Sequence, residues 1–269
     1  MAMLALCHVP KTGGTTLVDI LRRSYGLHHC DVRPLVPGRY YGSADHRFAA
    51  RLHPGLASVA GHMVSPSSDL EAACGEVLYY AVLREPFKRL ASAYQHVDRH
   101  GTPPATFVAA MKRPWWIEQQ CRQIAGRADV TLALDLIARK DVLLGLTEAF
   151  DEFLVMLRMR AGDPRLDIRY ERRNVAPDNT LARSLLEDAD VRSSIEEANP
   201  ADMELWRRVR DELYPAQRER FPGLERELKR FREEPPLPRW SARLTANRTY
   251  RNLVYKPAVA TVRHLRRTD

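Results

Sequence analysis

The chain has 269 residues, of which 45% are hydrophobic and 28% are charged, and its formal net charge at pH 7 is +8. These values exclude a disordered or collagen-like chain, and the length allows one soluble α/β domain with one appended element. No apolar run approaches the roughly 20 residues that span a bilayer. The first predicted strand begins at Leu4 and leaves no room for a secretory signal, so we expect a cytoplasmic protein.

Positive charge is concentrated at the C-terminal end of the chain, and the cysteines form no recognisable motif. Residues 239–269 carry seven Arg and one Lys against Asp269, a net charge of +7, which leaves about +1 for residues 1–238. The 36 Arg against 6 Lys fit a bacterial protein from a GC-rich genome. The four cysteines form no C-x-x-C pair and no cluster with metal-ligand spacing, so we predict buried free thiols and no metal site. They are Cys7, Cys30, Cys74 and Cys121.

The chain opens with an apolar run that ends in a basic, glycine-containing turn. Leu4–Pro10 predict a strand, Lys11 and Gly13–Gly14 follow, and Thr15–Thr16 begin a helical pattern. Glycines let the backbone approach a ligand closely, and the first N–H groups of a helix, with its dipole, favour an anion. The ATP-binding pattern G-x-x-x-x-G-K-[ST] is absent, because Lys11 precedes the glycines. Taken alone, the turn fits a phosphate site and a plain helix entry equally well.

Two further apolar runs end in candidate functional residues. Residues His28–Pro54 show no clear period and predict a long loop with short elements. Leu56–Ala60 then predict a strand that leads into Gly61 and His62. Ligands bind beyond the carboxyl ends of parallel strands, which puts His62 at the same edge as Lys11.

The next predicted strand, Glu76–Leu83, leads directly into Arg84, and Pro86 suits the first turn of a helix after it. In a P-loop kinase we would look after such a strand for an acidic residue that holds magnesium. This strand end supplies Arg84 instead.

Together these stretches resemble the sulfotransferases that use 3′-phosphoadenosine-5′-phosphosulfate (PAPS), most closely the heparan sulfate and uronyl 2-O-sulfotransferases. Pro10–Thr16 is similar to their 5′-phosphosulfate loop. Two motifs in the right order and at the right distance make the resemblance specific, and it spans roughly residues 3–220. Their 3′-phosphate motif is matched by Arg84-x-Pro86, Arg89, Ser92 and Tyr94. Further matches are Gly61-His62, Leu144–Glu148 with Phe150 and Phe153, and Asn199-x-x-Asp202-x-x-Leu205-Trp206.

The resemblance implies PAPS as co-substrate, without a metal. Lys11 is expected to meet the leaving 5′-phosphate, and His62 to act as general base. Arg84 and Ser92 are expected to clamp the 3′-phosphate. Arg172–Arg173 fall where relatives place a loop that covers the nucleotide, with solvated side chains as an equal alternative. The expected donor-binding residues are Lys11, Thr12, Gly13, Gly14, Thr15, Thr16, Arg84, Ser92, Arg172 and Arg173.

The resemblance says less about the acceptor. Relatives carry a second histidine two residues before the base, and that position here is Ala60, so the acceptor class is not carried over. Trp115–Trp116 are predicted as core residues, with a sugar-stacking wall as the alternative. Candidates for contact with an anionic acceptor, or else solvated charges, are Arg33, Arg39, His46 and Arg51 in the long loop. A second candidate acceptor-facing set is Gln119, Gln120, Arg122 and Gln123.

The remaining segments are mostly helical. A helical pattern runs from 102 to 140, Asp141–Leu146 predict another strand, and Thr147 is expected to cap a helix over Glu148–Arg160. Residues 178–232 are largely helical, and Pro235–Pro238 break the chain.

These patterns predict an α/β, P-loop-type three-layer fold with a mostly parallel central sheet flanked by helices in residues 1–234, and a basic, aromatic-containing extension in 235–269. The extension is expected to pack on the domain and attract an anionic glycan; contact with an acidic membrane is the alternative, and nucleic acid is not expected. The expected activity is sulfate transfer to a carbohydrate hydroxyl. A magnesium-dependent P-loop kinase and a non-catalytic nucleotide- or glycan-binding protein are the alternatives.

Overall fold

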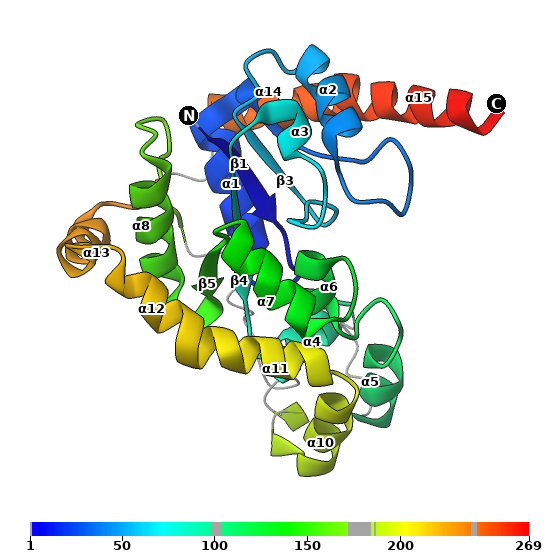
Figure 1. Cartoon of the computed structure of the whole chain (residues 1–269), viewed down its shortest axis with the longest axis vertical. Helices are drawn as coiled ribbons and strands as arrows, with labels where there is room; N and C mark the ends of the chain where they lie inside the picture. The colour runs from blue at the N-terminus through cyan, green and yellow to red at the C-terminus, as the bar shows by residue number, and fades with distance from the viewer. Residues whose placement is uncertain (1, 98–103, 172–183, 186, 238–240, 269) are drawn as a thin grey trace.

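The centre of the molecule is a sheet of five parallel strands (Figure 1). The computed structural model describes residues 2–97, 104–171, 184–185, 187–237 and 241–268. The strand order is β2-β3-β1-β4-β5. The predicted α/β class, with a parallel sheet between helices, is confirmed. The strands are β1 (Met3–Cys7), β2 (His29–Asp31), β3 (Ser58–Gly61), β4 (Val77–Leu83) and β5 (Leu143–Leu146).

Four of these strands coincide with predicted apolar runs. In β4 six of the seven residues are buried, as expected for a parallel strand covered on both faces. The fifth strand, β2, lies inside the stretch predicted as loop. Its three residues are too few to show an alternating pattern, and its pairing with β3 places His29 opposite Ser58.

Helices fill the connections between strands. Helix α1 ends at Tyr25 with Gly26 as its C-cap, and Pro200 begins α11. The helices are α1 (Gly14–Tyr25), α2 (Ser43–Leu52), α3 (Glu71–Cys74), α4 (Pro86–Val97), α5 (Pro104–Met111), α6 (Gln119–Ala125), α7 (Val130–Arg139), α8 (Phe150–Ala161), α10 (Ala189–Glu197), α11 (Pro200–Arg208), α12 (Tyr214–Glu219), α13 (Leu224–Glu233), α14 (Ala242–Tyr250) and α15 (Lys256–Thr268). Two short segments are 3₁₀-helical, η1 (Gly26–His28) and η2 (Thr147–Ala149). Two others are π-helical, η3 (Val209–Leu213) and η4 (Arg251–Tyr255).

Two local predictions are wrong. Thr147 does not cap a helix, because its hydroxyl donates to the carbonyl of Leu83 at 3.0 Å and a 3₁₀ turn precedes α8. Trp115 is not a core residue, since 61% of it is exposed. Its neighbour Trp116 is half-buried and packs against a second apolar cluster that includes Phe87 and Phe107. Because both residues are tryptophans, residue type alone could not show which of the two is the more buried.

A buried polar network joins α4, α6 and α11 behind the carboxyl end of β4. The Asp202 carboxylate in α11 accepts from the backbone N–H of Gln120 at 3.1 Å and of Cys121 at 2.8 Å, at the start of α6. In return, Glu118 accepts from the backbone N–H of Asp202 at 2.7 Å, at the start of α11. Arg89, fully buried in α4, lies 3.6 Å from Asp202. The two helix starts thus cap each other and hold a buried cation.

The C-terminal segment packs against the first third of the chain. Asn247, which is buried in α14, donates to the carbonyl of Gly26 at 2.7 Å and to that of His29 at 2.8 Å. Tyr255 is fully buried, and its hydroxyl accepts from the backbone N–H of Arg33 at 3.1 Å. This segment belongs to the folded body through α14 and η4, whereas α15 extends along one end of the molecule (Figure 1).

Two further expectations concern cysteines and membrane spans. All four cysteines are free; three are buried and Cys74 is half-buried. Within the described ranges, no helix combines the length and apolar character needed to cross a membrane.

We predict that Asp202→Ala lowers the free energy of unfolding by about 3–5 kcal/mol, because it leaves Arg89 as an uncompensated buried charge. Urea denaturation measures the change. The matched control is Asp211→Ala, which breaks the exposed ion pair with Arg210 and should change stability little. Equal effects of the two substitutions would contradict the role of the buried network.

Candidate functional site

Three loops meet at the carboxyl edge of the sheet, after β1, β3 and β4. The strands are neighbours, so His8 after β1 lies beside Gly61 at the end of β3, and its backbone N–H donates to the Gly61 carbonyl at 3.2 Å. His62 and Arg84 follow β3 and β4 directly. The sheet therefore gathers the residues that the sequence placed at this edge.

The loop after β1 has an unusual backbone. Lys11 has φ of 69° and Gly13 has φ of 88°, so two left-handed residues flank Thr12. The buried Thr12 hydroxyl donates to the carbonyl of Val9 at 2.9 Å and closes the turn. In α1 the backbone N–H of Thr16 donates to the carbonyl of Gly13 at 3.0 Å. The backbone N–H groups of Gly14 and Thr15 come before this bond, in the first turn of the helix. The turn presents a helix N-terminus of the kind that binds anions.

Two cations flank this turn. The Arg84 guanidinium donates to the carbonyl of Lys11 at 3.2 Å, which brings a charge from β4 to the loop after β1. Burial lowers the pKa of Lys11, and the charge of Arg84 lowers it further. Burial also lowers the pKa of Arg84. An anion bound here would relieve the repulsion between the two cations, so the residues fit a phosphate group.

The other members of the Arg84 motif differ in role. Arg89 is buried and donates to Gln119 at 2.8 Å and to the carbonyl of Trp116 at 2.8 Å, so it supports the fold and does not face a ligand. Ser92 is half-buried in the second turn of α4. Arg172 and Arg173 lie outside the described residues.

The glutamines of α6 do not face an acceptor, contrary to expectation. All three are buried. Gln120 accepts from the backbone N–H of Arg84 at 2.9 Å, and Gln123 donates to the carbonyl of Val64 at 2.6 Å. Because α6 starts inside the buried network, these amides position the backbone of the site, whereas Arg122 is exposed.

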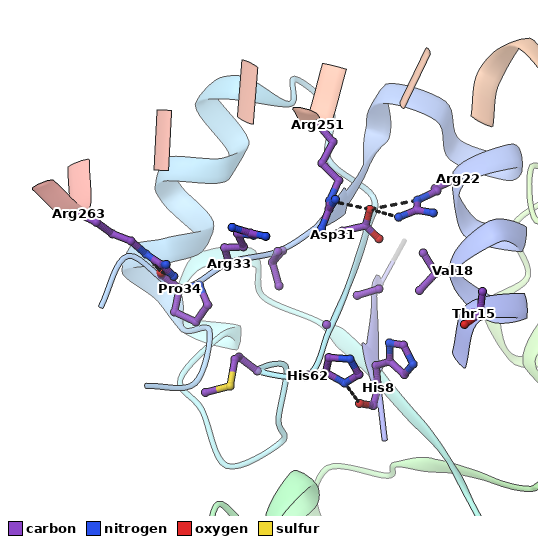
Figure 2. Close-up of a pocket in the computed structure, with 14 residues that line it drawn as sticks. His8, Thr15, Val18, Arg22, Asp31, Arg33, Pro34, His62, Arg251 and Arg263 are labelled. Atoms are coloured by element: carbon purple, nitrogen blue, oxygen red, sulfur yellow. Dashed lines mark hydrogen bonds and ion pairs between the residues drawn. The ribbon is translucent and has the colours of Figure 1, made fainter. Parts of the chain in front are cut away.

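The exposed side chain of His62 has a defined orientation. Its Nδ1 lies 2.7 Å from the carbonyl oxygen of His8. A carbonyl only accepts, so Nδ1 carries the proton in this bond and Nε2 keeps the lone pair of a base. The His8 ring lies against that of His62, with centroids 4.2 Å apart and planes at 31° (Figure 2). Burial and the neighbouring His62 lower the pKa of His8 to about 3.

A cavity of about 450 Å³ opens beside the two histidines (Figure 2). It is strongly basic, because among the described residues that line it there are four arginines and a single carboxylate, Asp31. Of the loop candidates only Arg33 lines it; Arg39, His46 and Arg51 do not. The lining residues that carry charge or an imidazole are His8, Arg22, Asp31, Arg33, His62, Arg251 and Arg263.

Asp31 organises the basic wall. Its carboxylate lies 2.6 Å from Arg22 and 3.1 Å from Arg251. Burial by itself would raise the pKa of Asp31, but the hydrogen bond with His29 and the charge of Arg22 outweigh it and hold the pKa well below its ordinary value. Arg263 donates from Nε to the carbonyl of Pro34 at 2.9 Å. The carboxylate stays charged under ordinary conditions, and the wall keeps a net positive charge.

Sequence reasoning missed His8 and most of this wall. His8 directly follows the first strand, and the rule that placed His62 at the sheet edge applies to it equally. The four arginines come from α1, from the segment that follows β2, from η4 and from α15, and nothing in their spacing signals that they line one cavity. Among the described residues, no three His, Cys, Asp or Glu side chains are grouped as metal ligands.

A basic, glycine-containing turn at a helix N-terminus, beside a second cation and at the edge of a parallel sheet, is typical of α/β proteins that bind phosphates or nucleotides. The particular family follows from comparison: residues 2–256 match the Sulfotransferase family, and the chain belongs to it. The match passes beyond the predicted boundary after residue 234. Sulfuryl transfer is the general activity of this family.

Other comparisons add little. A crystal structure of a sulfotransferase from Alicyclobacillus acidocaldarius is similar to this chain at 17% identity and a TM-score of 0.37. The similarity covers 77% of this chain and 99% of the other. Among curated proteins, none matches.

We predict that Gly13→Ala destabilises the fold more than Gly38→Ala. Both glycines have positive φ, which costs an L-residue about 1–2 kcal/mol. Only at Gly13 would the new Cβ also meet a ring, 2.7 Å from Cε2 of Phe150, whereas Gly38 has nothing within 4 Å. Thermal or urea unfolding of both variants measures the difference. Equal losses would show that Phe150 does not pack on the loop.

Proposed function

We propose that the protein transfers the sulfuryl group of PAPS to a hydroxyl of an anionic carbohydrate, with His62 as the general base. The observation that carries this proposal is the orientation of His62. Its Nδ1 is engaged by the carbonyl of His8, which precedes the Lys11 turn, at 2.7 Å, and the ring lines the basic cavity together with Thr15 of that turn. A base with its lone pair on Nε2 at this junction suits the removal of a proton from an acceptor hydroxyl.

The donor is proposed to bind at the turn after β1. The family generally uses PAPS, and the paired cations Lys11 and Arg84 suit its phosphates. In this arrangement the amides at the start of α1 and Lys11 bind the 5′-phosphate, while Arg84 and Ser92 bind the 3′-phosphate. Backbone N–H groups and a guanidinium already fixed by the fold need no reorganisation when charge develops.

The chemical step follows from these roles. The acceptor oxygen forms a bond to sulfur as the bond from sulfur to the 5′-phosphate oxygen breaks. The acceptor proton passes to Nε2 of His62, and Lys11 stabilises the negative charge that grows on the leaving phosphate. Positioning and charge stabilisation supply the catalysis.

The acceptor is proposed to occupy the cavity beside His62. A volume of about 450 Å³ fits a small ligand or one or two residues of a chain. Four arginines against Asp31 favour an acceptor that carries carboxylate or sulfate groups, since guanidinium pairs well with both. Arg251 and Arg263 come from the C-terminal segment, which is the contribution that we propose for it.

The general test is transfer of ³⁵S from labelled PAPS to a panel of oligosaccharides, matched in size and differing in uronic acid and sulfate content. Label should appear in anionic members and be absent from neutral ones. Transfer to neutral members alone would contradict the proposed acceptor, and label in none, with no nucleotide binding, would contradict the activity itself.

We predict that Arg84→Ala weakens the binding of adenosine 3′,5′-bisphosphate by about 10–100-fold, the effect of one lost charge-assisted contact. Binding of 5′-AMP, which lacks the 3′-phosphate, should fall much less. Calorimetry with both nucleotides separates the two effects. Equal losses would remove Arg84 from the 3′-phosphate site.

We predict that His62→Gln lowers the transfer rate by about 10²–10⁴-fold, as expected for loss of a general base. Bisphosphate affinity should stay within about twofold, because the side chain does not belong to the donor turn. Turnover near that of the wild type would exclude His62 as the base.

We predict that Arg33→Ala raises KM for an anionic acceptor and leaves kcat nearly unchanged, since the loss concerns ground-state binding. The effect should shrink at high salt. Arg39→Ala is the matched control, because Arg39 belongs to the same loop but does not line the cavity. Deleting 239–269 is unsuitable for this test, since it would remove the buried Tyr255.

A further inference from the structure

We infer that His8 is a positioning residue for His62, a role that rests on the proposed function: its carbonyl fixes the tautomer of the base, and its imidazole fixes the tilt of the base's ring. His8 directly precedes Val9 and Pro10, at the start of the loop that is proposed to bind the donor. The same residue would therefore position the base and begin the donor-binding loop.

The carbonyl contact is held by the sheet. The N–H of His8 donates to the Gly61 carbonyl at 3.2 Å, and its own carbonyl accepts from Nδ1 of His62 at 2.7 Å. Both bonds cross between the ends of β1 and β3. The oxygen that orients the base is thus a backbone atom of a residue bonded to the end of β3, and it does not depend on a flexible side chain.

The position of the His8 ring explains why residue 14 is a glycine. On one side the His8 imidazole lies 4.2 Å from that of His62, centroid to centroid. On the other side it covers Gly14, where a built Cβ would lie 1.8 Å from Nε2 and 2.0 Å from Cδ2 of His8. Gly14 is not among the residues with positive φ, so its backbone conformation does not require glycine. The position has no room for a side chain because the ring fills it.

The ring also remains uncharged. Burial and the nearby His62 lower the pKa of His8 to about 3, so the imidazole is neutral throughout the ordinary pH range. A neutral neighbour does not oppose the positive charge that His62 gains on taking the acceptor proton, whereas a protonated one would. His8 therefore supports His62 through position and neutrality and takes no part in proton transfer itself.

The first test measures the tautomer of His62 by ¹⁵N NMR in the wild-type protein, without donor or acceptor. The inference expects the neutral ring to be protonated at Nδ1. A ring protonated mainly at Nε2, the form that free imidazole side chains prefer, would overturn it. This result is independent of the activity, so a failure of the proposed function would not be mistaken for a failure of this inference.

The second test separates the imidazole of His8 from its carbonyl, which every substitution retains. His8→Ala should lower kcat about 10–100-fold, the scale of a misplacement of about 1 Å. The Nδ1-protonated form of His62 should persist, because the carbonyl remains, and bisphosphate affinity should stay within about twofold. His8→Phe keeps a flat ring and should recover most of the loss. His46→Ala is the control, since it removes a buried histidine that does not line the cavity.

The third test is a double-mutant cycle with Gly14→Ala. In the wild type the new methyl group must displace the His8 ring, and kcat should fall at least about tenfold. In the His8→Ala background the methyl group meets an empty space, and the same change should cost less than about threefold. Equal costs in both backgrounds would overturn the inference, as would an unchanged kcat in His8→Ala.

Discussion

The adjacency of β3, β1 and β4 in one parallel sheet is the constraint on which the site depends. It places three loops side by side, and each delivers one chemical function: His62 after β3, the Lys11 turn after β1 and Arg84 after β4. The contacts between loops are direct, from Nδ1 of His62 to the His8 carbonyl and from Arg84 to the Lys11 carbonyl. Because strands, and not mobile loops, set these spacings, the proposed base and the two cations are preorganised.

Partly buried cations at the sheet edge must be held by hydrogen bonds or ion pairs, since burial of an unpaired charge costs free energy. The support for Arg84 lies behind it, where Gln120 accepts from its backbone N–H and where α6 and α11 cap each other through Glu118 and Asp202. The buried Arg89 joins the same network. Beside the cavity Asp31 plays the corresponding part between Arg22 and Arg251. On each side of the site, therefore, a carboxylate holds arginines in place: Asp202 holds the buried Arg89, and Asp31, which itself lines the cavity, holds Arg22 and Arg251.

The sequence was sufficient for the elements whose signal is local. Apolar runs located four strands, and the sheet-edge rule brought His62, Lys11 and Arg84 together. Strand β2 has only three residues, too few for a period, and became visible only through its pairing with β3. Apart from Arg33, the sequence could not predict the basic wall, because Arg22 and Arg263 are far apart in the chain and line the same cavity only through the packing of α14 and η4. Trp115 and the α6 glutamines were misjudged because residue type does not reveal which side of a helix or turn is covered.

The most direct test of the account is calorimetric binding of adenosine 3′,5′-bisphosphate to the wild-type protein, compared with ATP plus magnesium. Lys11 before its glycines and Arg84 in place of an acidic residue predict clear preference for the bisphosphate, with no metal added. Preference for ATP with magnesium would contradict the account and make a P-loop kinase the better interpretation of the same turn.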